Sequence, residues 1–135
     1  MNFKFTELQA VIGIEQMKKL KNRINTKKKI WKTYQKLLQN TSGITIFNHD
    51  LEHTTPWFID VVVSNRSDLM KHLKSNDIGT RVMYPPIHSQ KCYDIKGEYP
   101  VSQNIGHNGL WLPSHVKLEN SDINFICKTI NDFYL

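Results

Sequence analysis

The sequence of 135 residues predicts a single α+β domain, residues 1–135, with long N-terminal helices and a small, mostly antiparallel sheet covered by helices on one face. Two observations predict this class. Apolar residues recur at helical spacing over the first part of the chain, and short β-branched runs then alternate with short helical stretches. The composition, 39% hydrophobic and 22% charged, is ordinary for a globular chain that can bury one core. We expect three or four strands, whose order the pattern leaves open.

The first helical segment opens with a clear start signal. Thr6 and Gln9 form a capping box, and Phe5, just before the cap, can pack onto Ala10 or its neighbours. The apolar residues that follow recur at helical spacing, which predicts one buried face. These residues are Leu8, Val11, Ile12, Met17 and Leu20.

A second helical segment runs from Asn22 to Asn40, and a bend near Lys21–Asn22 is compatible with the sequence. The polar run that precedes Gly43 ends it. Its apolar residues fall on one stripe, which marks a buried helix face. They are Ile30, Trp31, Tyr34, Leu37 and Leu38.

Short β-branched and aromatic runs predict the strands. The strongest run, Pro56–Val63, is almost continuously apolar, which indicates a central strand with both faces covered. Two prolines follow Tyr84 and force a rigid, extended exit from the strand before them. The expected strands are Ile44–Phe47, Pro56–Val63, Thr80–Tyr84 and Leu110–Ser114.

Three further helices are expected between and after these strands. Ser67–Lys74 has a serine cap, and Tyr99–Asn108 is a short helix that a glycine ends. The last helix is capped by Asn120–Asp122. Its buried stripe contains Cys127, which we interpret as a core thiol and not as a nucleophile.

The formal charge of +6 comes largely from lysines in the two N-terminal helical segments. Nucleic-acid binding is one interpretation of such crowding. These lysines lie between apolar positions, as on a solvated helix face, and no aromatic residues interleave with them for base stacking. We therefore expect no nucleic-acid partner. No apolar run approaches a membrane span and no secretory pattern is present, so we expect a cytoplasmic protein without a membrane partner.

The residues that could carry chemistry form no complete constellation. His49 and His53 are four apart, but their stretch has no helical pattern, so we interpret them as surface histidines. Cys92 and Cys127 have neither a metal-binding spacing nor a disulfide framework. We expect no metal site.

The first twenty residues carry a resemblance to a known family. Their pattern is Asn-aromatic-basic-x-Thr-acidic-Leu-Gln-Ala-x-x-Gly-x-x-Gln-x-x-Lys-Leu. It resembles the signature that opens the C-terminal part of the DegT/DnrJ/StrS sugar aminotransferases. The segments Arg81–His88, Tyr99–Gln103 and Leu110–Pro113 resemble later motifs of that family. The resemblance covers essentially the whole chain but only the C-terminal part of the family's pattern.

The resemblance implies a pyridoxal-phosphate enzyme of the fold-type I class, of which this chain is the small C-terminal domain. It implies that Asn2 reaches the cofactor phosphate of the neighbouring subunit and that Lys4 lies near the sugar-nucleotide diphosphate. It also implies that Tyr84 and His88 contact substrate in the intact enzyme. The family's cofactor-bonding lysine lies in a large upstream domain, and no lysine here has a matching context. We therefore expect no catalytic residue in this chain.

Two functions follow from this resemblance. The first is the C-terminal domain of an enzyme that transfers an amino group from glutamate to a nucleotide-linked keto sugar for surface polysaccharides, inactive alone and working as a homo-oligomer. The second is a non-catalytic, truncated domain that acts in self-association or partner binding. A missing partner surface also predicts exposed apolar area on the first helix.

Overall fold

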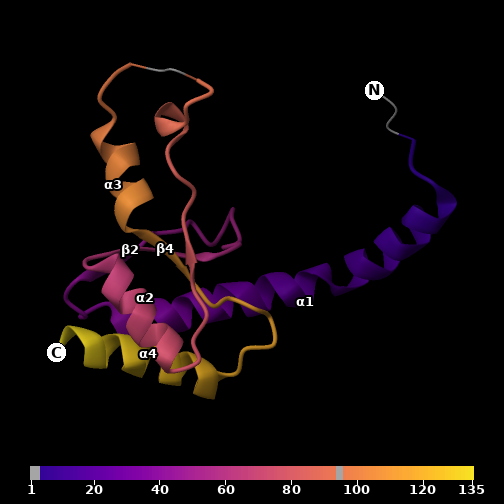
Figure 1. Ribbon diagram of the computed structural model, residues 1–135. Helices are drawn as coiled ribbons and strands as arrows, with labels where there is room; N and C mark the ends of the chain where they lie inside the picture. Colours follow the sequence, from indigo (N-terminus) through magenta and orange to yellow (C-terminus); the bar gives the residue numbers. More distant parts are fainter. Residues whose placement is uncertain (1–3, 94–95) are drawn as a thin grey trace.

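The computed structural model describes residues 4–93 and 96–135. Helices and strands follow one another in the order that the sequence predicts, and Figure 1 shows their arrangement. The elements are α1 (Glu7–Leu38), β1 (Ile44–Ile46), β2 (Ile59–Val63), α2 (Arg66–Ser75), β3 (Arg81–Val82), the 3-10 helix η1 (Ile87–Ser89), α3 (Pro100–Asn108), β4 (Gly109–Leu112) and α4 (Asn120–Tyr134).

The four strands form one sheet in the order β1-β2-β4-β3, and every neighbouring pair is antiparallel. The predicted small antiparallel sheet is thus confirmed. In the central pair, Val61 lies opposite Leu110 and Ile59 opposite Leu112, and all four side chains are buried. The other face of β2 is only half-buried, so the expectation that both its faces are covered holds in part.

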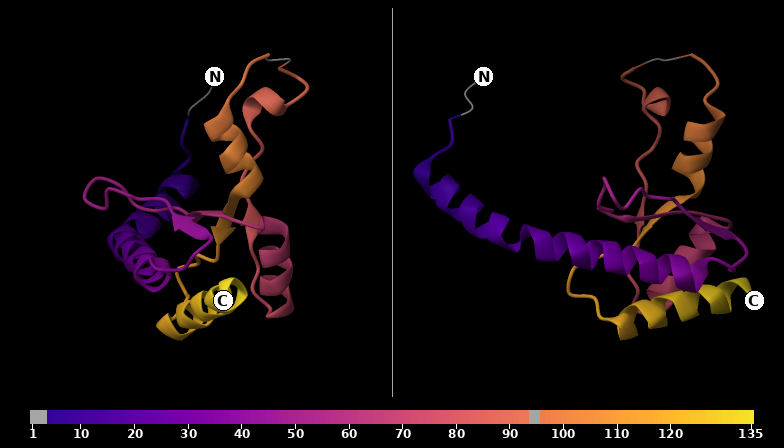
Figure 2. Two further views of the ribbon diagram at one scale, coloured as in Figure 1. Left: turned by 90° about the vertical axis from the view of Figure 1, so that its left-hand side faces the viewer. Right: turned by 180° about the vertical axis from the view of Figure 1, so that it is seen from behind.

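One hydrophobic core lies between the sheet and its helices. Figures 1 and 2 show α2, α4 and the C-terminal half of α1 together on one face of the sheet, as the sequence predicts. Helix α3 stands apart from this layer and contacts β2 and β4. The most deeply buried helical residues include Tyr34, Leu38, Leu69, Leu73 and Ile130.

Helix α1 is one continuous helix, so the two helical segments expected from the sequence join without a break at Lys21–Asn22. Its start has the predicted capping box, since the Gln9 N–H donates to Thr6 Oγ1 and the Thr6 N–H donates to Gln9 Oε1. With neither glycine nor proline between Glu15 and Leu38, nothing in the sequence interrupts the hydrogen-bond ladder there.

The N-terminal half of α1 projects beyond the sheet layer (Figures 1 and 2). Its apolar side chains are exposed, so the prediction that they form a buried face is wrong for this chain, and the prediction of exposed apolar area is confirmed. Helical periodicity reports a face suited to burial, but the surface that buries it need not lie in the same chain. The residues are Leu8, Val11, Ile12, Met17 and Leu20.

Two helix starts differ from the sequence prediction. The residue before α2 is Asn65, with φ of 54°, and Ser67 lies inside the helix. Asparagine tolerates this left-handed conformation better than most residues, so it can end the loop there. At α4 the capping box is formed by Glu119 and Asp122, with the Glu119 N–H donating to Asp122 Oδ2 at 2.8 Å.

Candidate functional site

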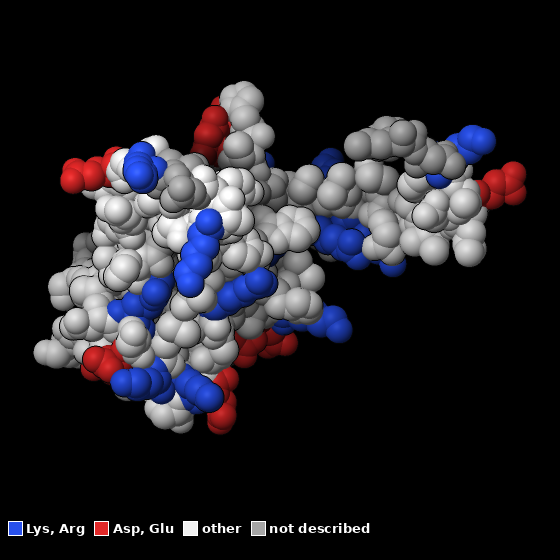
Figure 3. Space-filling view, turned by 45° about the horizontal axis from the view of Figure 1, so that its top comes forward, with Lys and Arg blue, Asp and Glu red and all other residues white. Residues whose placement is uncertain are grey.

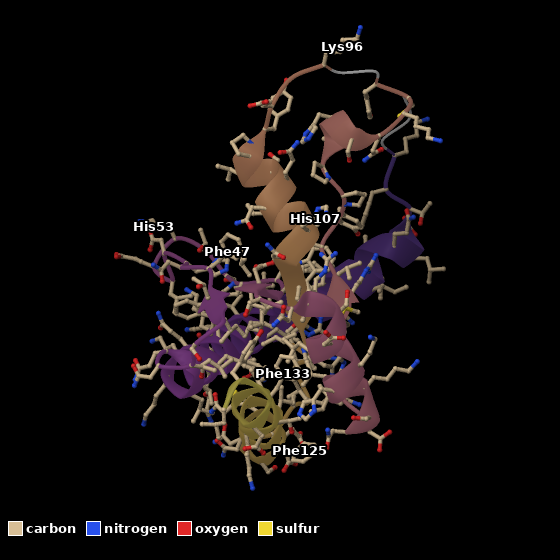
Figure 4. The ribbon with its side chains drawn as sticks, turned by 60° about the vertical axis from the view of Figure 1, so that its left-hand side comes forward. Phe47, His53, Lys96, His107, Phe125 and Phe133 are labelled. Atoms are coloured by element: carbon tan, nitrogen blue, oxygen red, sulfur yellow. The ribbon has the colours of Figure 1, made fainter. Side chains whose placement is uncertain are left out.

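The loop between β3 and α3 carries His88 into a pocket of about 770 Å³. His88 lies in η1, directly after the two prolines, and its ring packs on the Tyr99 ring with 4.5 Å between centroids. Helix α3 forms the opposite wall, and Figure 4 labels His107 on it. The polar residues that line the pocket include Arg66, His88, Gln103, Asn104 and His107.

Close backbone contacts fix the walls of this pocket. A Cβ on Gly106 would lie 2.5 Å from Pro86 Cδ, so only glycine lets α3 approach the proline loop this closely. Arg66 Nη1 donates to the carbonyl oxygens of Gly106 at 2.8 Å and Gly109 at 3.1 Å. This guanidinium satisfies carbonyls at the C-terminal end of α3 and ties that end to the start of α2.

The open face of the sheet carries a second cluster. The pairing register aligns Asp60 of β2, Trp111 of β4 and Arg81 of β3 in one row across the sheet. Trp111 Nε1 donates to Asp60 Oδ1 at 2.6 Å, which fixes the indole in the row. The Phe58 ring stacks on Trp111 with 4.4 Å between centroids and 17° between planes.

Tyr84 joins this second cluster. Its ring meets the Trp111 ring edge-on at 5.1 Å, and Arg81 Nη2 donates to its hydroxyl at 3.3 Å. The Arg81 guanidinium carbon lies 5.4 Å from the Tyr84 centroid and 5.6 Å from the Trp111 centroid. We call Phe58, Arg81, Tyr84 and Trp111 the aromatic shelf.

The residues predicted to bind cofactor and substrate fall into three places. Tyr84 lies on the shelf, whereas His88 lines the pocket beside α3, and Tyr84 does not line that pocket. Lys4 directly precedes α1, and the start of this helix lies well away from η1 and α3 in Figure 1. Asn2 lies outside the described residues. Within one chain, the described members of this set therefore do not converge.

Two groups with shifted pKa values have structural roles. Burial raises the pKa of the Cys127 thiol to about 12, so this cysteine is not a nucleophile at neutral pH. Burial lowers the pKa of Lys27, but its ammonium donates to the carbonyl oxygens of Trp57 at 2.6 Å and Ser114 at 2.7 Å. Lys27 thus joins α1 to the loops before β2 and after β4.

The remaining polar residues give no metal centre within residues 4–93 and 96–135. His53 Nδ1 lies 2.9 Å from Asp50 Oδ2, and this hydrogen bond is the main cause of the lowered pKa of Asp50. His49 Nε2 lies 3.5 Å from Asp60 Oδ2 at the edge of the row. His49 is half-buried, so its interpretation as a surface histidine is only partly right.

Basic residues are spread widely over the surface. On the face drawn in Figure 3, Lys and Arg side chains dot both the body and the projecting helix, with Asp and Glu among them. Four lysines of α1 line a groove of about 670 Å³ beside the start of α4. They are Lys28, Lys29, Lys32 and Lys36. No helix in the described part of the chain is both long and apolar enough to span a bilayer.

The family model described as the DegT/DnrJ/EryC1/StrS aminotransferase family matches residues 1–131, nearly the whole chain. The chain belongs to this family. GDP-perosamine synthase of Escherichia coli O157:H7 is 29% identical over 98% of this chain and 37% of its own length. The chain thus spans well under half the length of this relative.

Solved structures agree with the family assignment at the level of fold. The sugar aminotransferase CalS13 from Micromonospora echinospora matches 98% of this chain and 36% of its own, with a TM-score of 0.87 and 18% identity. A Streptococcus pneumoniae protein solved in a PLP-form matches 98% of this chain and 37% of its own, with a TM-score of 0.82 and 21% identity. The predicted fold, a partial α+β domain like that in these solved structures, is confirmed.

The sequence motifs of the DegT/DnrJ/EryC1/StrS family led to Tyr84 but not to the rest of the shelf. Phe58 and Asp60 are two residues apart along the predicted strand Pro56–Val63, so they share a face of the sheet. This spacing could have indicated from sequence alone that they lie close together. Trp111 and Arg81 come from other strands. Only the pairing register places Trp111 opposite Asp60 and Arg81 opposite Trp111.

Proposed function

We propose that this chain is the small C-terminal domain of a pyridoxal-phosphate-dependent aminotransferase that acts on a nucleotide-linked keto sugar, with glutamate as amino donor. The observation that carries the proposal is a family match spanning residues 1–131. The relative from E. coli is named for a GDP-linked amino sugar, and a structural neighbour was solved in a PLP-form. A cytoplasmic location is part of the same proposal.

In this proposal, the lysine that forms the covalent bond to the cofactor lies in another part of the enzyme. When bound, pyridoxal phosphate acts as an electron sink for amino transfer and needs a lysine to hold it. Lys27 is a poor candidate, because its ammonium is already occupied by two carbonyls and by Ser114 Oγ. The E. coli relative has more than half of its length outside the match, which leaves room for the lysine there.

The geometry of the chain supports a role in a homo-oligomer. Lys4, proposed for the substrate diphosphate, directly precedes α1, and the start of α1 lies far from the loop that carries Tyr84 and His88, proposed for substrate. Asn2, proposed for the cofactor phosphate, is two residues before Lys4 in the sequence. One chain would thus serve two active sites, with its N-terminal end reaching the site of a neighbouring subunit. The exposed apolar residues of the projecting helix supply a surface for such packing.

A chimera tests this proposal. This chain would replace the matching part of the E. coli GDP-perosamine synthase, and the same enzyme without any replacement segment would be the control. We expect the chimera to convert glutamate to 2-oxoglutarate only when the GDP-linked keto sugar is present, at roughly a tenth or more of the parent rate, and the control to be inactive. A chimera that folds and retains pyridoxal phosphate but transfers no amino group would contradict the proposal.

The second candidate is a non-catalytic domain that acts in self-association or partner binding. The exposed apolar half of α1 favours it, because Leu8 and Met17 are 73% and 65% exposed. The same chimera separates the two candidates. Restored amino transfer supports the enzyme domain, and a folded chimera without transfer supports the binding domain.

A further inference from the structure

The groove beside the start of α4 carries charge of a single sign. It lies between α4 and the C-terminal half of α1, two helices that contact each other (Figures 1 and 2). Its lining contains Lys28, Lys29, Lys32 and Lys36 but no aspartate or glutamate, and we call it the lysine groove. A cleft lined by one sign of charge focuses the electric field and raises the local concentration of ions of the opposite sign.

The lysines of this groove have no acidic neighbours on their own helix. On a solvated helix face, carboxylates three or four residues away usually pair with lysines, but α1 has no acidic residue after Glu15. The side chains of Lys29, Lys32 and Lys36 form no ion pair within residues 4–93 and 96–135. Like charges four residues apart, as at Lys32 and Lys36, destabilise a helix, so the pattern is not explained by the stability of α1.

The acidic residues at the start of α4 have a different role. Asp122 Oδ2 accepts from the Glu119 N–H at 2.8 Å, and the Glu119 side chain accepts from the Asp122 N–H in the capping box. Neither of them lines the groove, whereas Asn120 and Asn124 do. The groove therefore offers ammonium groups and amide N–H donors, and both kinds of group bind phosphate oxygens.

The spacing of the lysines indicates how far the charge of a ligand extends. Between Lys28 and Lys36 the helix rises about 12 Å, and each turn in this stretch carries a groove lysine. Lys28 Nζ also donates to the Leu51 carbonyl oxygen, which fixes this lysine in place. A single phosphate would meet one turn of this row, whereas several linked phosphates would meet two or three.

We propose that the lysine groove binds a small oligophosphate, a linear anion whose phosphates follow α1. This inference goes beyond the proposed function and does not depend on it. The groove lining has no aromatic residue on which a nucleobase could stack, which disfavours single-stranded nucleic acid. The apolar stripe of this half of α1 is buried in the core, so the helix cannot place that stripe in a bilayer interface.

Calorimetric titration of the purified full chain with sodium tripolyphosphate, at low salt and neutral pH, tests this inference. Tripolyphosphate is expected to bind about tenfold more tightly than inorganic phosphate, because it meets several lysines at once. Lys32→Gln should weaken its binding about fivefold, the scale of one exposed charge contact. Lys74→Gln on the exposed face of α2 removes the same charge outside the groove and should leave the affinity unchanged. In NMR spectra, tripolyphosphate should shift the side-chain amide signals of Asn120 and Asn124.

Three results would each overturn the inference. They are tripolyphosphate binding no tighter than inorganic phosphate, equal losses in Lys32→Gln and Lys74→Gln, and unchanged Asn120 and Asn124 signals. Vesicles containing anionic lipid and a random DNA duplex are titrated in parallel. If the chain binds either of them through Lys32 but does not bind tripolyphosphate, the groove is a surface for a macromolecule and the inference is wrong. None of these results bears on amino transfer by the chimera, so the proposed function is tested separately.

Discussion

Replacing Tyr34 with alanine is expected to lower the free energy of unfolding by about 4 kcal/mol. Tyr34 has no exposed surface and lies where α1 meets the core. Its hydroxyl donates to the Pro113 carbonyl at 3.0 Å, and burial raises its pKa well above the ordinary value. Alanine would leave a ring-sized cavity and an unpaired carbonyl. Since domains of this size are stabilised by roughly 5–15 kcal/mol, much of the chain's stability would be lost.

Tyr34→Phe is the matched control for this prediction. It keeps the ring and removes only the hydroxyl, so its expected cost is about 1–2 kcal/mol. Urea unfolding followed by circular dichroism measures both variants. If alanine and phenylalanine cost the same, the ring does not fill the core as the structure has it.

Replacing Gly109 with alanine is expected to destabilise the protein by about 3 kcal/mol. A Cβ there would lie 2.3 Å from the Ile105 carbonyl oxygen and 2.6 Å from Met83 Sδ. The first neighbour is backbone in the last turn of α3 and cannot rotate away, so the α3–β4 junction must shift. That junction also accepts the Arg66 hydrogen bond and pairs β4 with both β2 and β3.

Gly79→Ala provides the control, because a Cβ at Gly79 meets no atom within 4 Å. Its expected effect is within about 0.5 kcal/mol. Both variants add one methyl group to a glycine, so the difference between their urea midpoints reports the close packing at Gly109. Equal midpoints would show that the packing at the end of α3 is looser than described.

Local chemistry explains why much of the fold was predictable. The Thr6–Gln9 capping box, the stripe that includes Tyr34, and the strand runs are each encoded within a few residues. The buried face predicted for the start of α1 failed because periodicity cannot tell whether the covering surface lies in the same chain. The start of α2 moved because Asn65 adopts the left-handed conformation before the helix, and the start of α4 moved because Glu119 forms the capping box one residue before the expected cap.

The candidate site was predictable only in part. Two prolines predicted a rigid exit after the strand, and η1 and the pocket at His88 follow from it. The direction of each side chain depends on sheet register and loop path, so the separation of Tyr84 from His88 could not be read from their spacing. The contact of Arg81 with Trp111 joins strands that are thirty residues apart in the chain.

The most direct test of the account asks whether this chain has a cofactor-bonding lysine of its own. The purified chain would be incubated with pyridoxal phosphate, reduced with borohydride and mapped by mass spectrometry, with excess inorganic phosphate as competitor. We predict weak labelling spread over exposed lysines and no protection by phosphate. One dominant lysine that phosphate protects would contradict it, because the chain would then build a complete cofactor site by itself.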